Sequence, residues 1–138
     1  MKPEMLVALA LEAMTHAYAP YSGYKVGAAL LCSDGSVYCG ANIENAAFGP
    51  SNCAERTAMF TAVFEGHRDF TAIAVVGGKD GNAVDFFPPC GVCRQVMQEF
   101  CGPNFLIHMG KGDGSYQTVR LDALLPYGFS AATHMKNG

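Results

Sequence analysis

Residues 72–109, AIAVVGGKDGNAVDFFPPCGVCRQVMQEFCGPNFLIHM, contain the pattern that decides the fold. The apolar run Ala72–Val76 is typical of a buried strand. Residues 90–100 predict a helix that Gly102-Pro103 ends, and Phe105–Met109 predicts a second strand. A strand, a helix and another strand in this order indicate a βαβ crossover, in which the two strands run parallel.

The residues before this stretch repeat the same arrangement. A strand is expected over Ser36–Gly40, and a helix is expected from about Cys53 to Phe64, with Ser51 or Asn52 as its N-cap. Because this helix leads into the strand at Ala72, the chain makes two successive crossovers. Helices that follow parallel strands begin at the same edge of the sheet, where ligands bind in open α/β folds.

The two ends of the chain add elements on either side of the crossovers. The remaining expected elements are a helix over Pro3–Tyr18, a strand over Lys25–Leu31 joined to its neighbour by the hairpin turn Asp34-Gly35, a strand over Tyr116–Arg120, and a short helix over Asp122–Leu125. The sequence therefore predicts one α/β domain over residues 1–138, with a five-stranded mixed sheet.

Composition narrows the possible partners and the compartment. The 138 residues include nine basic and twelve acidic ones, which give a net charge of −3, and the basic residues form no run. This balance does not favour nucleic-acid or membrane-surface binding. Glu4 and Glu12 interrupt the N-terminal apolar stretch, so no signal peptide is expected and the protein is predicted to be cytoplasmic. Only 15% of the residues are charged, which suggests further buried surface such as a subunit interface.

Three of the six cysteines occupy distinctive positions. Disulfides are not expected in a cytoplasmic chain of this size. Cys90 and Cys93 lie three residues apart at a predicted helix start and so share a face. Such a pair alone could be a thioredoxin-like redox site, half a zinc site or two core thiols. Cys53, at the other helix start, supplies a third thiol, and the positive ends of both helices favour the thiolates that zinc binds.

The number of ligands separates catalytic from structural zinc. Three protein ligands leave one position open for water, which is typical of catalytic sites. A fourth ligand from Cys32, Cys39, Cys101 or a histidine would instead make a closed structural site. Glu55, two residues after Cys53, could take a proton from water activated by the metal. The alternative is that Glu55 is only a favourable charge in the first helical turn.

These features resemble the small homotetrameric cytidine deaminases, zinc-dependent enzymes of pyrimidine salvage, over nearly the whole chain. The spacing of Cys53-x-Glu55 and Pro89-Cys90-x-x-Cys93, with 36 residues between Cys53 and Cys90, matches the zinc deaminase signature. The matching segments are Ala19-Pro20-Tyr21-Ser22, Val26-Gly27-Ala28-Ala29, Asn42-Ile43-Glu44-Asn45, Cys53-Ala54-Glu55-Arg56-Thr57-Ala58, Pro89-Cys90-Gly91-x-Cys93-Arg94-Gln95 and Leu124-Leu125-Pro126.

The resemblance implies a three-layer α/β/α fold, one zinc ion per chain and a role for each matching residue. The implied metal ligands are Cys53, Cys90 and Cys93, the implied catalytic residue is Glu55, and the implied substrate-binding residues are Asn42 and Glu44 for the ribose hydroxyls, Ala54 for the pyrimidine edge, and Tyr24, Ala46, Phe48 and Phe129. Tyr24 replaces the phenylalanine that the family usually places against the base. The resemblance also puts Phe48 at a subunit boundary and Phe129 in a neighbouring chain's active site.

Arg56 is not an expected metal ligand, but the resemblance implies that it donates hydrogen bonds to the ligand sulfurs. Three thiolates around Zn²⁺ carry a net charge of −1, which makes a bound water less acidic. A guanidinium that donates to the sulfurs withdraws part of this charge and restores the acidity. The alternative is an arginine on the solvent-exposed face of its helix.

The implied reaction is hydrolytic deamination of cytidine or 2′-deoxycytidine to uridine or 2′-deoxyuridine, with release of ammonia. Three other functions would use a similar zinc site. A deaminase of polynucleotides would need a positively charged channel, which the acidic chain does not favour. A blasticidin S deaminase shares the zinc signature, but the segment Asn42–Asn45 favours a ribose ligand. A structural zinc module would have a closed metal site and a dispensable Glu55.

Overall fold

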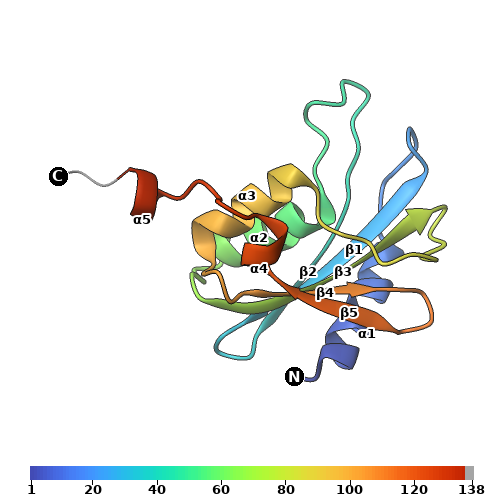
Figure 1. Ribbon diagram of the computed structural model, residues 1–138. Coiled ribbons are helices and arrows are strands. Elements are labelled where there is room, and N and C mark those ends of the chain that lie inside the picture. Colours follow the sequence, from blue (N-terminus) through green and yellow to red (C-terminus); the bar gives the residue numbers. More distant parts are fainter. Residues whose placement is uncertain (136–138) are drawn as a thin grey trace.

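A computed structural model describes residues 1–135 and contains a five-stranded sheet in the order β2-β1-β3-β4-β5 (Figure 1). The strands are β1 Tyr24–Cys32, β2 Val37–Ala41, β3 Phe70–Lys79, β4 Leu106–Gly110 and β5 Tyr116–Arg120, and the helices are α1 Pro3–Met14, α2 Ala54–Phe64, α3 Gly91–Phe100, α4 Leu121–Leu124 and α5 Ala131–His134. None of the helices in the described part of the chain is long and apolar enough to cross a membrane.

Strand directions confirm the two predicted crossovers. Strand β1 is antiparallel to both of its neighbours, β2 and β3, so β2 and β3 run in the same direction. Strands β3 and β4 are parallel neighbours. Helices α2 and α3 therefore each join two strands of the same direction, and both begin at one edge of the sheet. Strand β5 is antiparallel to β4, which makes the sheet mixed, as expected.

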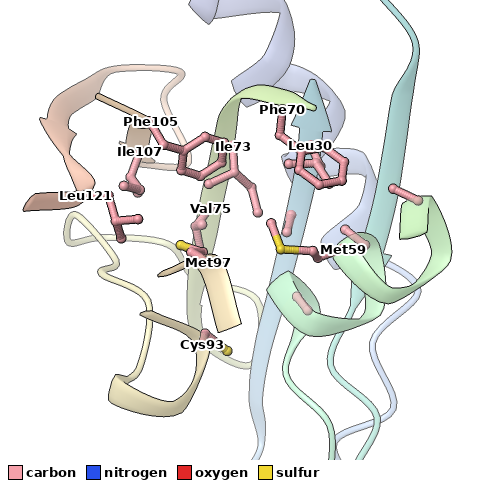
Figure 2. Packing of buried hydrophobic residues seen from close by; sticks show 14 of the residues in the cluster. Leu30, Met59, Phe70, Ile73, Val75, Cys93, Met97, Phe105, Ile107 and Leu121 are labelled. Atoms are coloured by element: carbon pink, nitrogen blue, oxygen red, sulfur yellow. The ribbon is translucent and has the colours of Figure 1, made fainter. Parts of the chain in front are cut away.

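Helices cover both faces of the sheet, so the predicted α/β/α layers are confirmed. Helix α1 packs its apolar face on one side, where Leu6 and Val7 belong to a cluster that includes Ala29 and Ala74. Helices α2, α3 and α4 lie on the other side, over a larger core (Figure 1). In that core Met59 of α2 and Met97 of α3 point toward Leu30, Ile73 and Val75 of the sheet (Figure 2).

Several element boundaries differ from the sequence-based expectation. Helix α1 ends at Met14 instead of Tyr18, because the backbone of Tyr18 pairs with the segment 42–44. Helix α2 has Cys53 as its N-cap, so the expected caps Ser51 and Asn52 were wrong. The Asn52 side chain instead donates a hydrogen bond to the Thr57 hydroxyl at 3.0 Å. Helix α5 was not predicted.

Gly27 of β1 lies where the sheet and α1 make their closest backbone approach. A Cβ atom at this position would collide with the backbone of Ala10 and Met14 in α1. We expect Gly27→Ala to lower the free energy of unfolding by about 1–3 kcal/mol, because α1 would have to move off the sheet. Chemical denaturation measures the change. Gly102→Ala is the matched control, since a Cβ there has no neighbour within 4 Å, and equal stability of the two variants would contradict this account.

Candidate functional site

Three cysteine sulfurs meet where α2 and α3 begin. Cys53 is the N-cap of α2, Cys90 is the N-cap of α3, and Cys93 lies in the first turn of α3. Their Sγ atoms lie within 4.8 Å of one another, and the Cys53 and Cys90 sulfurs are 3.7 Å apart. A tetrahedral zinc ion with Zn–S bonds of about 2.3 Å holds its sulfurs about 3.8 Å apart. The cluster therefore has the dimensions of a zinc site.

The charges of these thiols also favour a cation. Hydrogen bonding with the Cys93 thiol, together with the nearby Arg56 guanidinium, lowers the pKa of Cys53 to about 5. The pKa of Cys93 is raised, first by its hydrogen bond to Cys53 and then by burial and nearby negative charge. One thiolate therefore forms readily, whereas a second beside it is disfavoured. Three thiolates at this position need a positive ion among them.

Packing and hydrogen bonds hold the cysteine side chains in place. Cys93 is buried and lies one turn from Met97 on the side of α3 that faces the core (Figure 2). The backbone N–H of Cys93 donates to the Cys90 sulfur at 3.5 Å. On the other helix, Arg56 donates from Nη2 to the Cys53 sulfur at 3.3 Å. The guanidinium thus contacts a sulfur of the cysteine cluster directly, so Arg56 does not face only solvent.

Glu55 is a buried carboxylate beside the cysteine cluster. Its side chain is 3% exposed, although it lies in the first turn of a helix where a carboxylate could face solvent. Burial raises the pKa of Glu55 to about 7, and the negative charge of Cys53 acts in the same direction. A carboxyl group that is kept out of water in a cavity, next to a metal site, is suited to take up and return a proton.

A cavity of about 540 Å³ opens in front of Glu55 and the cysteines. This volume lies in the range of small-ligand sites. The walls come from β1 and the residues before it, from the segment 42–56, and from the residues before α3 together with the first turn of that helix. The lining residues are Ser22, Tyr24, Val26, Asn42, Glu44, Phe48, Gly49, Ser51, Asn52, Cys53, Ala54, Glu55, Arg56, Phe87, Pro88, Cys90 and Val92.

Glu44 and Asn42 are polar residues of this cavity that the surrounding backbone holds in place. Glu44 Oε1 accepts hydrogen bonds from the N–H groups of Tyr21 and Ser22, both at 3.0 Å, and Oε2 accepts one from the Ser22 hydroxyl. These donors lower the pKa of Glu44, so the group is an ionised acceptor. Asn42 accepts from the Val26 N–H and donates to the Tyr24 carbonyl, both at 2.8 Å.

The other predicted substrate-binding residues divide into two groups. Tyr24, Phe48 and Ala54 line the cavity together with Glu55. Ala46 and Phe129 do not line it. Phe129 stacks on His134 with ring centroids 5.1 Å apart. The resemblance places Phe129 in the active site of a neighbouring chain, so a single chain does not test its role. The roles of Phe129 and Ala46 therefore stay predictions.

Ser22 and Phe87 are two of the lining residues that the sequence did not predict as site residues. Ser22 fixes the Glu44 carboxylate, and Phe87 forms an apolar wall next to Pro88. Ser22 stands in the segment Ala19–Ser22, which was noted only as part of the family pattern. For Phe87 the available signal was its place immediately before Pro88-Pro89-Cys90, where an aromatic side chain is close to the ligand helix in sequence.

Comparison with known proteins agrees with this geometry. The family model described as "Cytidine and deoxycytidylate deaminase zinc-binding region" matches residues 1–109. A cytidine deaminase from Halalkalibacterium halodurans is 50% identical over 131 residues, covering 95% of this chain and 96% of the relative. One from Sporosarcina psychrophila is 45% identical over 94% of this chain and 93% of the relative. The crystal structure of cytidine deaminase from Burkholderia pseudomallei superposes with a TM-score of 0.87 at 44% identity, over 94% of this chain and all of the other.

Proposed function

The chain belongs to the zinc-dependent cytidine deaminase family and is an enzyme that acts on cytidine, and we propose that it also deaminates 2′-deoxycytidine. The products are uridine and 2′-deoxyuridine, with release of ammonia. The observation that carries the proposal is the placement of buried Glu55 in one cavity with the cysteine cluster and the ionised Glu44. We place this activity in pyrimidine salvage in the cytoplasm.

The cysteine cluster and its neighbours define the reacting end of the cavity. Cys53, Cys90 and Cys93 would hold the zinc ion, which supplies a water molecule whose pKa is lowered toward neutrality. Glu55 accepts a proton from the attacking water and delivers it to N3 of the pyrimidine as the water oxygen bonds to C4. Glu55 then takes the proton of the new C4 hydroxyl and passes it to the amino group, so that the C4–N bond breaks and ammonia leaves. Arg56 draws negative charge from the Cys53 sulfur, and the Ala54 backbone holds the edge of the base.

The other end of the cavity is suited to the sugar. Glu44 is an ionised acceptor, and the hydroxyls of a sugar are donors. A contact from Glu44 to the 3′-OH supports the use of both nucleosides, because ribose and deoxyribose share that hydroxyl. Asn42 keeps one amide hydrogen and one oxygen lone pair beyond the bonds that anchor it to β1.

An ultraviolet assay on four compounds tests this function. We expect turnover of cytidine and 2′-deoxycytidine, weak or no turnover of the free base cytosine, and none of blasticidin S. Cytosine lacks the sugar that Glu44 and Asn42 would bind, whereas it keeps the reacting ring. Turnover of cytidine without 2′-deoxycytidine would reject the sugar argument, and efficient turnover of blasticidin S would favour the alternative deaminase.

We also propose that the enzyme is a homotetramer in which Phe129 reaches a neighbouring active site. Large apolar side chains are exposed in the described residues, among them Phe48 at 71%, Phe64 at 86% and Phe129 at 54%. Helix α5 has no buried residue and extends from the body of the chain (Figure 1). Surface of this kind favours contact with further copies.

Sedimentation velocity at micromolar concentration should show a species with the mass of four chains. Phe129→Ala should lower cytidine turnover in the assembled enzyme, because the aromatic ring would be missing from the neighbour's cavity. Phe60→Ala is a control, since Phe60 is also an exposed phenylalanine but lies on α2 outside the cavity lining. A stable monomer with full activity would refute both the assembly and the role of Phe129.

A further inference from the structure

A second group of metal-ligating side chains lies beyond the other end of α2. Cys32 is the last residue of β1, Asp34 lies in the turn to β2, and His67 follows the end of α2. One ligand atom from each, a sulfur, a carboxylate oxygen and a ring nitrogen, lies within 4.8 Å of the other two. Helix α2 has 11 residues and is therefore about 16 Å long, so this group is separate from the cysteine cluster at its start.

The distances fit a coordinated ion better than a direct contact. His67 Nδ1 and Asp34 Oδ2 are 3.6 Å apart, which is too long for a good hydrogen bond. Two ligands bonded to one tetrahedral zinc ion at about 2.1 Å each are separated by about 3.4 Å. The nitrogen and oxygen thus lie nearly at the spacing that a shared metal ion requires.

Each ligand is oriented by contacts of its own. Asp34 Oδ1 accepts from the N–H and hydroxyl of Ser36, at 3.0 and 2.6 Å, which directs Oδ2 toward His67. The His67 ring packs against the Tyr38 ring with centroids 5.2 Å apart. Cys32 is held by strand pairing with Phe70. Little reorganisation is therefore needed to bind an ion.

Exposure allows an ion to enter from solvent. The Asp34 side chain is 59% exposed and that of His67 is 24% exposed, whereas Cys32 is buried and forms the floor of the group. A thiolate and a carboxylate neutralise a divalent cation, and water can complete the coordination. Thiolate together with imidazole selects zinc and similar borderline metals over Mg²⁺ or Ca²⁺.

We propose that Cys32, Asp34 and His67 form a second zinc-class binding site in this protein. It does not depend on the deaminase activity. A bound ion would tie the β1–β2 hairpin to the connection between α2 and β3. The existing backbone bond from the Ser33 N–H to the Asp69 carbonyl, at 3.0 Å, already joins these two segments beside the group.

Calorimetric titration with Zn²⁺ tests the proposal on holoenzyme that already carries its first zinc. We expect one further equivalent per chain to bind. His67→Ala and Cys32→Ser should each weaken binding of this equivalent at least tenfold, while the first zinc and cytidine turnover stay unchanged. His16→Ala is the matched control, because His16 is exposed and belongs to no metal-ligating group in residues 1–135.

Cobalt gives an independent readout of the thiolate. Co²⁺ added to the holoenzyme should produce a near-ultraviolet sulfur-to-metal charge-transfer band. Cys32→Ser should lose this band. Cys39→Ser is the control and should retain it, because Cys39 is an exposed cysteine outside the group. Should Cys32→Ser fail to fold, Asp34→Asn, on an exposed turn, serves instead and should weaken the second equivalent. Saturation of the wild type at one equivalent overturns the proposal, as does a second equivalent that persists in both His67→Ala and Asp34→Asn.

Discussion

Glu55→Gln should lower cytidine turnover by about 10²- to 10⁴-fold, with the larger loss expected, while the zinc ion of the cysteine cluster is retained. Glutamine keeps the size of the side chain and its capacity for hydrogen bonds, but it cannot accept a proton at neutral pH. A positioned general base contributes a factor in this range, and one carboxylate serves several proton transfers in the proposed reaction. Metal analysis and the ultraviolet assay on the same preparation measure both quantities.

Glu44→Gln is the matched control for this experiment. The same chemical change is made in the same cavity, but at the end proposed to bind the sugar. We expect KM for cytidine to rise while kcat changes little, because proton transfer stays in place. Near-normal turnover of Glu55→Gln would show that the proposed mechanism is wrong, whatever the zinc content. A fall in kcat of equal size in both variants would remove the distinction between the two carboxylates.

Cys90→Ala should remove the zinc ion that the cysteine cluster Cys53, Cys90 and Cys93 holds, and should abolish deamination. Only two sulfurs would remain, and two ligands do not retain zinc against dilution. Cys90 is exposed, so its replacement leaves the core intact. Cys53→Ala and Cys93→Ala should lose the metal as well. Cys93 is buried in the cluster that contains Met97, and its replacement should also cost stability.

Cys39→Ala and Cys101→Ala are the controls for metal loss. Neither residue belongs to the cysteine cluster at the helix starts. Both variants should retain the first zinc, with packing losses of about 1 kcal/mol or less. Full zinc retention in Cys53→Ala, Cys90→Ala or Cys93→Ala would remove that cysteine from the ligand set.

The crossover pattern could be predicted because it depends on local signals. The apolar strands that begin at Ala72 and Phe105, and the helix between them, can each be recognised from neighbouring residues alone. Boundaries set by distant pairing were not predictable in the same way. Tyr18 continues a helical pattern but pairs with the segment near Ile43. Strand β3 extends through Gly77 and Gly78 to Lys79, because β1 provides pairing partners for residues without strand propensity.

The convergence of the predicted site residues followed from the sequence more readily than the contacts that hold their side chains. Cys53, Glu55 and Arg56 are close in sequence, and Cys90 and Cys93 follow a helix start, so one crossover rule brings them together. The Glu44 carboxylate depends on Ser22 and Tyr21, more than 20 residues away, and no spacing rule connects these positions. The N-cap of helix α2 was also not predictable from local sequence. Ser51 and Asn52 are stronger N-cap residues than Cys53, but they bond to Asn45 and Thr57 instead.

The first metal site is built from two helices that are far apart in sequence, and this has a consequence for how stability is measured. The unfolded chain presents Cys53 separately from Cys90 and Cys93, so it binds zinc more weakly than the native chain does. By mass action, each tenfold rise in free zinc above the dissociation constant then adds about 1.4 kcal/mol to the apparent stability. The melting temperature of this protein is therefore defined only at a stated, buffered zinc concentration.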